Sequence, residues 1–308
     1  MIFPKPLRRG DKVAILSPSS HIIPERVDGA ASVLQDWGYE PVICPHCKGH
    51  RGTYSGNVEE RLADLLWAVG EPSVRAILCS RGGYGAVQLL PSLPTELIRR
   101  DPKWLIGFSD ISALHAAWLR AGVASLHSSM AKLLAECGTA DPCSRLMLDV
   151  LQGRFPRYSI PAHPLNRHGQ ASGMIVGGNL AVLSALVSTP YDILKPGRIL
   201  FIEDINEEIY KVERMLYTLL LNGTLARLSG LIVGRFTGQH SPDRNGDTME
   251  QMISRMVAPF GYPVAIGLPI GHIDGNVPIV EGSYATLTVT ASGTTLQLTT
   301  CTPADFPQ

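Results

Sequence analysis

Residues 104–114 read Trp-Leu-Ile-Gly-Phe-Ser-Asp-Ile-Ser-Ala-Leu, an apolar run that changes abruptly into a polar helix start. The run Trp104–Phe108 predicts a short buried strand, and the helix over Asp110–Arg120 has an apolar stripe made of Ile111, Leu114 and Trp118. Ser109 then stands at a sharp strand-to-helix turn, near the positive end of the helix dipole. That is the geometry of a nucleophile elbow. Serine is also a common helix cap, and this segment alone favours the cap.

The rest of the first half alternates strand-like and helix-like segments around this turn. Such alternation predicts an α/β fold, with a parallel sheet and helices on both faces, of the flavodoxin or Rossmann-like kind. We expect helices over Glu25–Trp37 and Val58–Val69, the second with its inner face on Leu62, Leu65 and Leu66. The expected strands are Lys12–Leu16, Glu40–Cys44, Val74–Cys79, Trp104–Phe108 and Ala124–His127.

The second half differs in its pattern and predicts a separate domain. Residues rich in proline and glycine with little periodicity predict a linker over 158–172, between an amino-terminal domain of residues 1–157 and a carboxy-terminal domain of 173–308. The second domain is expected to be mixed α/β and rich in β. Its last strands form an antiparallel hairpin that turns at Ser292-Gly293. The other expected elements are helices over 178–186, 207–221 and 248–256 and strands over 198–202 and 230–235.

Composition excludes several classes of protein. The 308 residues include 27 Lys plus Arg and 27 Asp plus Glu, so the formal net charge is zero. Binding to nucleic acid or to an anionic membrane through bulk charge is therefore not expected. The amino end has basic residues but no apolar segment after them, and the longest nearly apolar stretch, Met174–Val187, is too short to cross a bilayer. We expect a cytoplasmic protein with no membrane partner.

The cysteines indicate neither a disulfide scaffold nor a metal centre. Six cysteines in a chain of this length are too few for a disulfide-dense fold. Cys44-Pro-His-Cys47, with His50 nearby, resembles half of a zinc site, but no second cysteine pair follows at the required spacing. A surface or half-buried loop is the favoured interpretation, and we expect no metal and no cofactor.

Acyl transfer by Ser109 would need a base and a group that orients the base. His272 lies in Ile266-Gly-Leu-Pro-Ile-Gly-His-Ile-Asp-Gly275, a loop whose glycines and proline hold the backbone in defined turns. His127 ends a strand at the edge where parallel sheets bind ligands. Glu203 follows an apolar strand, so its carboxylate would be at least partly buried and would need a partner. Asp204 could cap the helix that follows.

A glycine loop, Arg81-Gly-Gly-Tyr-Gly85, leaves another strand. Glycines allow backbone N–H groups to approach a ligand closely, and such donors suit a phosphate or an oxyanion equally well. The loop lacks the spacing of a dinucleotide site. A simple tight turn remains an alternative.

Five blocks of sequence together resemble the LD-carboxypeptidase family of serine peptidases, in order and in spacing. The resemblance runs from about Lys12 almost to the end of the chain. The blocks are Arg81-Gly-Gly-Tyr-Gly85, Gly107-Phe-Ser-Asp110, Gly177-Gly-Asn-Leu180, Ile202-Glu-Asp-Ile205 followed by Tyr210 and Val212-Glu-Arg-Met-Leu216, and Gly271-His272.

The resemblance implies a Ser–Glu–His triad and a substrate. Ser109 would be the nucleophile, Glu203 the orienting group and His272 the base. The backbone N–H groups of Gly83 and Asp110 would form the oxyanion hole. Family members are muramoyltetrapeptide carboxypeptidases, which release the terminal D-alanine from a cytoplasmic murein tetrapeptide during cell-wall recycling, and the family suggests a homodimer. The candidate substrate contacts are Arg81, Tyr84 and His127.

The chain departs from the family pattern at one place, and two alternative functions remain open. The family often has Gly-Pro-Met where this chain has Ser128-Ser129-Met130, which affects the floor of the pocket but not the triad. An amidase of the same fold that hydrolyses a peptide–nucleotide antibiotic would need an aromatic residue to stack on a nucleobase, whereas Trp104 and Trp118 look like core residues. The other alternative is a non-catalytic ligand-binding protein, or a nucleotide-binding domain that uses the glycine loop.

Overall fold

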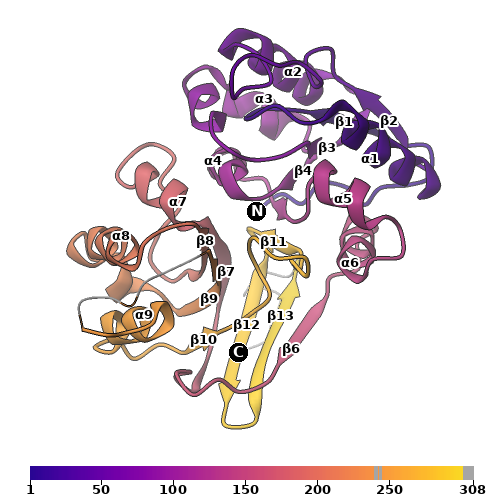
Figure 1. Ribbon diagram of the computed structural model, residues 1–308. Helices are drawn as coiled ribbons and strands as arrows, with labels where there is room; N and C mark the ends of the chain where they lie inside the picture. The colour runs from indigo at the N-terminus through magenta and orange to yellow at the C-terminus, as the bar shows by residue number, and fades with distance from the viewer. Residues whose placement is uncertain (239–241, 243–244, 301–308) are drawn as a thin grey trace. The chain divides into compact units, whose positions relative to one another are not determined.

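The computed structural model describes residues 1–238, 242 and 245–300 and divides into two compact units (Figure 1). Unit 1 consists of Met1–Phe155 and Asp274–Glu281, and unit 2 of Pro156–Ile273 and Gly282–Gln308. From the sequence, all residues after 172 are predicted to belong to the carboxy-terminal domain. In the structure, Asp274–Glu281 belongs to unit 1 instead. Residues 301–308 of the predicted second domain lie outside the described residues.

The sheet of unit 1 confirms the predicted parallel α/β fold, and of the two predicted kinds its strand order is the flavodoxin-like one. Its parallel strands have the order β2-β1-β3-β4-β5, and a further strand, β11 (Ile279–Glu281), pairs antiparallel with β5 at one edge. Apart from β2, whose residues are exposed or half-buried, these strands are short runs of mostly buried residues, which is typical of a parallel sheet covered on both faces. The strands are β1 (Lys12–Leu16), β2 (Glu40–Ile43), β3 (Val74–Cys79), β4 (Trp104–Gly107) and β5 (Ser125–His127).

The helices of unit 1 cover this sheet, and one of them buries a different face than its sequence predicts. Helix α2 buries Arg61, Asp64 and Leu65, whereas Leu62 and Leu66 are only half-buried. The apolar pattern places Arg61 and Asp64 on the outer face of the helix. Both are buried instead, because their side chains form hydrogen bonds with neighbouring loops. The helices are α1 (Pro24–Asp36), α2 (Val58–Gly70), α3 (Thr95–Arg100), α4 (Ser112–Arg120), α5 (Ala131–Cys137) and α6 (Pro142–Leu151), with 3₁₀ turns η1 (Ala86–Ser92) and η2 (Ser109–Ile111).

Unit 2 is mixed α/β and rich in strands, as the sequence predicts. Its sheet has the order β10-β9-β8-β7-β12-β13-β6, with parallel pairing from β7 to β10 and antiparallel pairing in the remainder. The predicted hairpin is present as β12 and β13. The elements are β6 (Arg157–Ile160), β7 (Gly169–Asn179), α7 (Leu180–Leu186), β8 (Ile199–Ile205), α8 (Ile209–Leu221), η3 (Leu225–Arg227), β9 (Gly230–Thr237), α9 (Met249–Val257), β10 (Val264–Ile266), β12 (Tyr284–Thr290) and β13 (Gly293–Thr299).

The predicted linker over 158–172 is too long, because β6 takes its first residues and β7 its last, and only residues 161–168 lie between the two strands. Two glycines of β7, Gly173 and Gly177, allow neighbouring backbone to approach closely. A Cβ added to Gly173 would lie 2.5 Å from the carbonyl oxygen of Gly197, and one added to Gly177 would lie 2.0 Å from that of Phe201. Glycine inside a strand often marks such an approach of another backbone.

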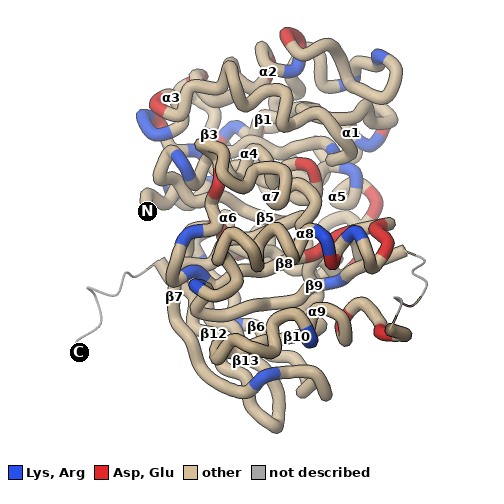
Figure 2. Tube along the Cα trace, turned by 90° about the vertical axis from the view of Figure 1, so that its left-hand side faces the viewer, with Lys and Arg blue, Asp and Glu red and all other residues tan. Residues whose placement is uncertain are grey.

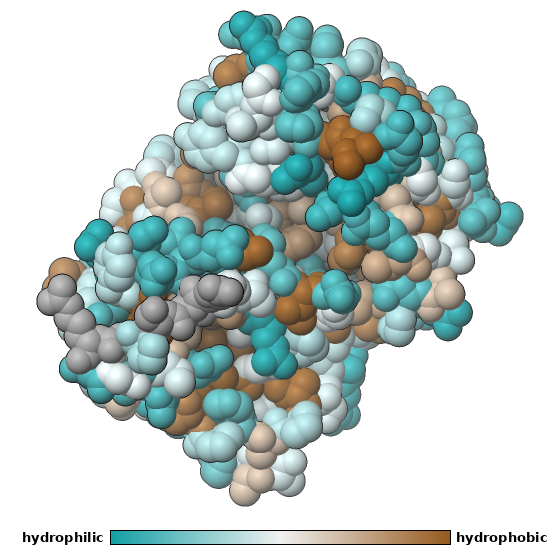
Figure 3. All heavy atoms as spheres, viewed as in Figure 1, coloured by the Kyte–Doolittle hydropathy of each residue, from teal (hydrophilic) through white to brown (hydrophobic). Residues whose placement is uncertain are grey.

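The surface carries charges of both signs on both units, in keeping with the zero net charge (Figure 2). In the view of Figure 3 hydrophilic residues predominate, and hydrophobic ones are scattered among them. Among the described residues, none of the helices combines the length and the apolar character that a membrane span requires.

Candidate active site

The turn after β4 is a strained elbow with Ser109 at its corner. Phe108 is extended with φ −154°, and Ser109 follows with φ 65°. A residue with a side chain pays roughly 1–2 kcal/mol for this left-handed conformation. The cap positions of η2 and α4 are Phe108 and Ile111, so Ser109 does not stand where a capping serine would. The geometry is that of a nucleophile elbow.

The glycine loop after β3 lies directly against this elbow. A Cβ added to Gly82 would lie 2.9 Å from Cβ of Ser109 and 3.3 Å from the backbone nitrogen of Asp110. The next residue, Gly83, has φ 114°, and a Cβ there would overlap the hydroxyl of Ser20. Only glycine allows the loop to come this close. The structure therefore brings together the loop and the serine that the sequence singled out separately.

The carboxylate of Asp110 joins the loops that follow β1, β3 and β4. Its Oδ2 atom accepts a hydrogen bond of 2.5 Å from the hydroxyl of Ser19 and one of 2.8 Å from the backbone N–H of Ala86. All of these loops leave the carboxyl ends of parallel strands, and the order of the strands reverses between β1 and β3. Open α/β sheets bind ligands at such a point.

Arg61 is a supporting residue that sequence reasoning missed. Its buried guanidinium donates through Nη1 to the carbonyl oxygens of Pro18, at 2.8 Å, and Gly85, at 3.0 Å. It also lies over the ring of Tyr54, 4.9 Å from its centroid. Burial lowers the pKa of Arg61. The signal in the sequence is its position one turn before Leu65 on the buried face of α2, where an arginine needs polar partners.

The predicted substrate contacts differ in their exposure. Arg81 is half-buried and donates to the carbonyl of His21 at 3.1 Å. Tyr84 is 57% exposed. His127 has no exposed surface, and its ring packs against those of Phe108 and His115 at centroid distances of 5.8 and 6.5 Å. His127 therefore packs behind the elbow rather than lining an open surface, because its strand lies inside the sheet between β4 and β11.

Unit 2 contains a histidine–glutamate pair made from the other two predicted catalytic residues. Oε2 of Glu203 lies 2.7 Å from Nδ1 of His272. Glu203 is completely buried in β8, whereas the side chain of His272 is 16% exposed. Since a carboxylate can only accept, Nδ1 of His272 carries the proton of this bond, and Nε2 of the neutral ring is left as the basic nitrogen. This is the arrangement of a general base held by an acidic partner.

Glycine in the loop of His272 is required by its approach to Glu203. Gly271 has φ 124°, and a Cβ there would lie 2.9 Å from Oε2 of Glu203 and 3.0 Å from its Cβ. On the neighbouring strand, a Cβ added to Gly234 would lie 2.7 Å from the carbonyl oxygen of Ile270. His272 can therefore lie close to the Glu203 carboxylate because glycine stands both in its loop, at Gly271, and on the neighbouring strand, at Gly234.

Asp204 caps a different helix than the sequence predicts. Its Oδ2 accepts from the backbone N–H of Ala181 at 2.9 Å, at the start of α7, and its Oδ1 accepts from Asn179 at 2.8 Å. The helix that follows in sequence, α8, begins only at Ile209. Parallel pairing places the end of β7 beside β8, which brings the start of α7 to Asp204. Burial raises the pKa of Asp204 to about 6.

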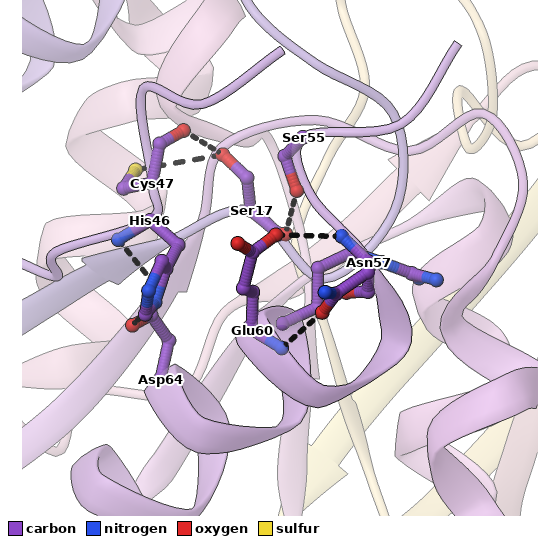
Figure 4. A network of polar contacts seen from close by, with 8 residues as sticks. Ser17, His46, Cys47, Ser55, Asn57, Glu60 and Asp64 are labelled. Carbon is purple, nitrogen blue, oxygen red and sulfur yellow. Dashed lines mark hydrogen bonds and ion pairs between the residues drawn. The ribbon is translucent and has the colours of Figure 1, made fainter. Parts of the chain in front are cut away.

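The Cys44–Cys47 loop is part of a polar network in unit 1 (Figure 4). Both cysteines are buried, and burial raises the pKa of Cys47 to about 12. The hydroxyl of Ser17 donates to the carbonyl of Cys47 at 2.6 Å, and Nδ1 of His46 lies 2.9 Å from Asp64. The loop as a whole is half-buried, as expected, because Pro45 is exposed and His46 is only half-buried. Within the described part of the chain, no group of three or more His, Cys, Asp or Glu residues is arranged to hold a metal.

The departure at Ser128-Ser129 places two hydroxyls inside unit 1. Both serines are buried, and in the described part of the chain their Oγ atoms have no hydrogen-bond partner. The backbone N–H of Ser128 donates to the carbonyl of Gly107 at 3.0 Å. This contact lies on the strand that leads into the elbow.

Family comparisons cover most of the chain. The N-terminal domain of the LD-carboxypeptidase family matches residues 13–128, and its C-terminal domain matches residues 172–287. The first match contains Ser109, and the second contains both Glu203 and His272.

Individual relatives agree with these matches. The "Probable murein peptide carboxypeptidase" of Bacillus subtilis is 33% identical over 92% of this chain and 91% of its own length. The "Murein tetrapeptide carboxypeptidase" of Pseudomonas aeruginosa is 31% identical over 90% and 92%.

Solved structures share the fold. Muramoyltetrapeptide carboxypeptidase from Oxalobacter formigenes superposes with a TM-score of 0.84 at 29% identity, over 93% of this chain and 98% of that one. The microcin C7 self-immunity protein MccF has the same TM-score of 0.84 at 20% identity, over 98% and 100%, and this likeness shows the fold alone. The chain therefore belongs to the LD-carboxypeptidase family of serine peptidases.

Proposed function

We propose that this protein releases the terminal D-alanine from a murein tetrapeptide, with Ser109 as nucleophile, His272 as general base and Glu203 as its orienting partner. The observation that carries the proposal is the 2.7 Å bond between Glu203 and His272. A buried carboxylate on one nitrogen of a partly exposed imidazole leaves the other nitrogen basic, and this is what a serine hydroxyl needs to become a nucleophile.

The chemistry follows in two steps. His272 accepts the proton of Ser109 as the hydroxyl oxygen attacks the carbonyl carbon before D-alanine, and the amides of Gly83 and Asp110 receive the oxyanion. The carbon–nitrogen bond then breaks, and D-alanine leaves with the proton from His272. Water, activated by the same histidine, hydrolyses the acyl-enzyme and regenerates Ser109. Losing one oxyanion donor typically costs about 10²- to 10³-fold in rate.

A carboxypeptidase must also hold the free carboxylate of its substrate. Arg81 supplies a guanidinium at the start of the glycine loop, and guanidinium pairs well with carboxylate. Tyr84 offers an exposed ring in the same loop. We assign these two residues to substrate binding, and we leave His127 out because it is buried.

The decisive experiment measures D-alanine released from L-Ala-D-Glu-meso-diaminopimelate-D-Ala. We expect turnover by the wild type and a loss of at least about 10³-fold in Ser109→Ala, with an unchanged circular dichroism spectrum. An acyl-sulfamoyl-adenylate assayed in parallel tests the amidase alternative. Trp104 and Trp118 are 1% and 0% exposed, so neither can stack on a base. Cleavage of the adenylate without cleavage of the tetrapeptide would overturn the proposal.

We further propose, from the family resemblance, that the protein is cytoplasmic and a homodimer. Helix α8 supports an association surface, because Leu221 is 83% exposed and Tyr210 and Tyr217 are 54% and 45% exposed. Light scattering after size exclusion measures the mass in solution, and cell fractionation measures the location. A monomeric mass at micromolar concentration would contradict the dimer.

A further inference from the structure

The imidazole of His115 folds back across the elbow that carries Ser109. His115 lies on α4, after the elbow, and its Nε2 is 2.9 Å from the carbonyl oxygen of Gly107, the last residue of β4 before the elbow. A carbonyl oxygen can only accept, so Nε2 carries the proton. The side chain is completely buried. One hydrogen bond therefore joins the helix after Ser109 to the strand before it.

The other ring nitrogen is also engaged. Nδ1 of His115 lies 2.8 Å from the hydroxyl of Ser125, the first residue of β5. Burial lowers the pKa of His115 to about 4, so the ring is neutral at neutral pH. With its proton on Nε2, the ring accepts from Ser125 through Nδ1, which fixes the tautomer and the orientation of the ring.

The carbonyl of Gly107 receives a second donor. The backbone N–H of Ser128 donates to it at 3.0 Å. Together with Nε2 of His115, this provides a donor for each of its two lone pairs. The orientation of the peptide group that leads from β4 into Phe108 is thereby fixed from two directions, and Ser109 follows at φ 65°.

The ring of His115 also approaches strand β11. Oε1 of Glu281 lies 3.9 Å from Nδ1 of His115, and Glu281 is opposite Ser125 in the antiparallel pair of β11 with β5. Both side chains are completely buried. The ring of His115 thus contacts β4, β5 and β11, all within unit 1. A ring packed among three strands has little room to adopt another rotamer.

We propose that His115 is a positioning residue for the nucleophile: its Nε2–H holds the carbonyl of Gly107 and so keeps Ser109 in its strained backbone conformation. His115 acts through the backbone and does not touch the substrate. The inference rests on the proposed role of Ser109. If His115 only filled space in the core, an apolar side chain of similar size would support catalysis equally well. If its hydrogen bond to Gly107 matters, such a side chain would lower the rate.

The test compares His115→Gln with His115→Met. These two side chains have nearly the same shape, but only glutamine can donate to the carbonyl of Gly107. For D-alanine release, we expect His115→Met to lower kcat by about 10- to 100-fold, in the range of a displaced reacting group, with KM nearly unchanged. His115→Gln should recover most of this loss. Thermal unfolding of both variants measures the structural cost, which should be similar.

A second readout separates this inference from the proposed function. A fluorophosphonate labels an activated serine without the peptide substrate, and Ser109→Ala shows whether the label is on Ser109. We expect slower labelling in the Met variant than in the Gln variant, even if the tetrapeptide is not the substrate. Equal kcat and equal labelling in the two variants overturn the inference alone. Absence of D-alanine release by the wild type overturns the proposed function alone.

Ser125→Ala carries the test if the Met variant does not fold. This change leaves the imidazole in place but removes the donor to Nδ1, so the proton can move away from Nε2. We expect kcat to fall about 3-fold or more with KM unchanged, as for a weakened hydrogen bond. A wild-type kcat in Ser125→Ala would then overturn the inference.

Discussion

At the scale of the residue, backbone positions that only glycine tolerates determine how the proposed catalytic groups are held. Gly271 and Gly267 lie in the same loop, with φ values of 124° and 92°. A Cβ at Gly271 would meet Glu203 at 2.9 Å, whereas one at Gly267 would meet nothing within 4 Å. The two positions share a positive φ, and only at Gly271 would an added Cβ meet Glu203 and the carbonyl oxygen of Arg235, so they form a matched pair.

We expect Gly271→Ala to lower kcat by about 10²-fold, because the added methyl group pushes the Glu203 carboxylate away from His272. Gly267→Ala carries a similar conformational cost, on the order of 1 kcal/mol, and should keep its activity. Initial rates of D-alanine release and thermal unfolding of both variants make the comparison. Equal activity in the two variants would contradict a role for the close approach of Gly271.

The sequence identified individual residues better than the bonds between them. Ser109, Glu203 and His272 were each marked by local patterns: a strand-to-helix turn, a strand end and a rigid loop. The contacts of Arg61 with the loops after β1 and β3, and of His115 with Gly107, join residues that are distant or on different elements. Such pairings depend on how the elements pack, and no local pattern encodes them.

At the scale of the element, Asp204 links the end of β7, the start of α7 and strand β8. Its pKa of about 6 in the folded protein lies above its ordinary value of 3.8 because it is buried. The folded protein therefore holds this proton more tightly than the unfolded chain does. It follows that this group's contribution to stability falls as the pH rises from about 4 to about 6 and is constant above that range.

We expect Asp204→Asn to remove this part of the pH dependence. Urea unfolding at several pH values between 4 and 7 gives the free energy of unfolding of the wild type and the variant. The variant should lose stability overall, since one oxygen that accepts from Asn179, Ile205 or Ala181 is replaced by a donor. Its stability relative to the wild type should rise with pH across that window. A constant difference would contradict a titrating Asp204.

Elements with regular patterns were predictable, and those shaped by contact were not. Most parallel strands of unit 1 are apolar runs bounded by turn residues, and they alternate with helices along the chain. This alternation predicted the parallel α/β fold. Strand β7 was missed because its glycines resemble a linker, although Gly173 and Gly177 are there to admit neighbouring backbones. The buried face of α2 was misassigned because Arg61 and Asp64 are buried through hydrogen bonds rather than through hydrophobicity.

At the scale of the whole molecule, the first unit is built from two separate pieces of chain. Strand β11 belongs to residues 274–281 and completes the sheet beside β5. Without it, the edge of β5 and the completely buried His115 would lose their neighbour. Exposed strand edges favour aggregation.

A fragment of residues 1–155 should therefore unfold at a lower temperature than the same fragment joined to residues 274–281 by a glycine–serine linker. The fragment alone should also bind more of an apolar dye. Thermal scans and dye fluorescence at matched concentration make the test, and a scrambled 274–281 segment serves as the control. Identical unfolding temperatures for the fragment and the fusion would show that β11 adds no stability to unit 1.

The division of unit 1 also has a consequence for protein synthesis. The ribosome makes residues 1–155 first but reaches β11 only after all of residues 156–273, which at typical rates takes on the order of ten seconds. During that interval the nascent sheet ends at β5, and the turn that carries Ser109 is already made. Since β11 follows His272 closely in the chain, the sheet that carries the proposed nucleophile can close only when the proposed base has also been made.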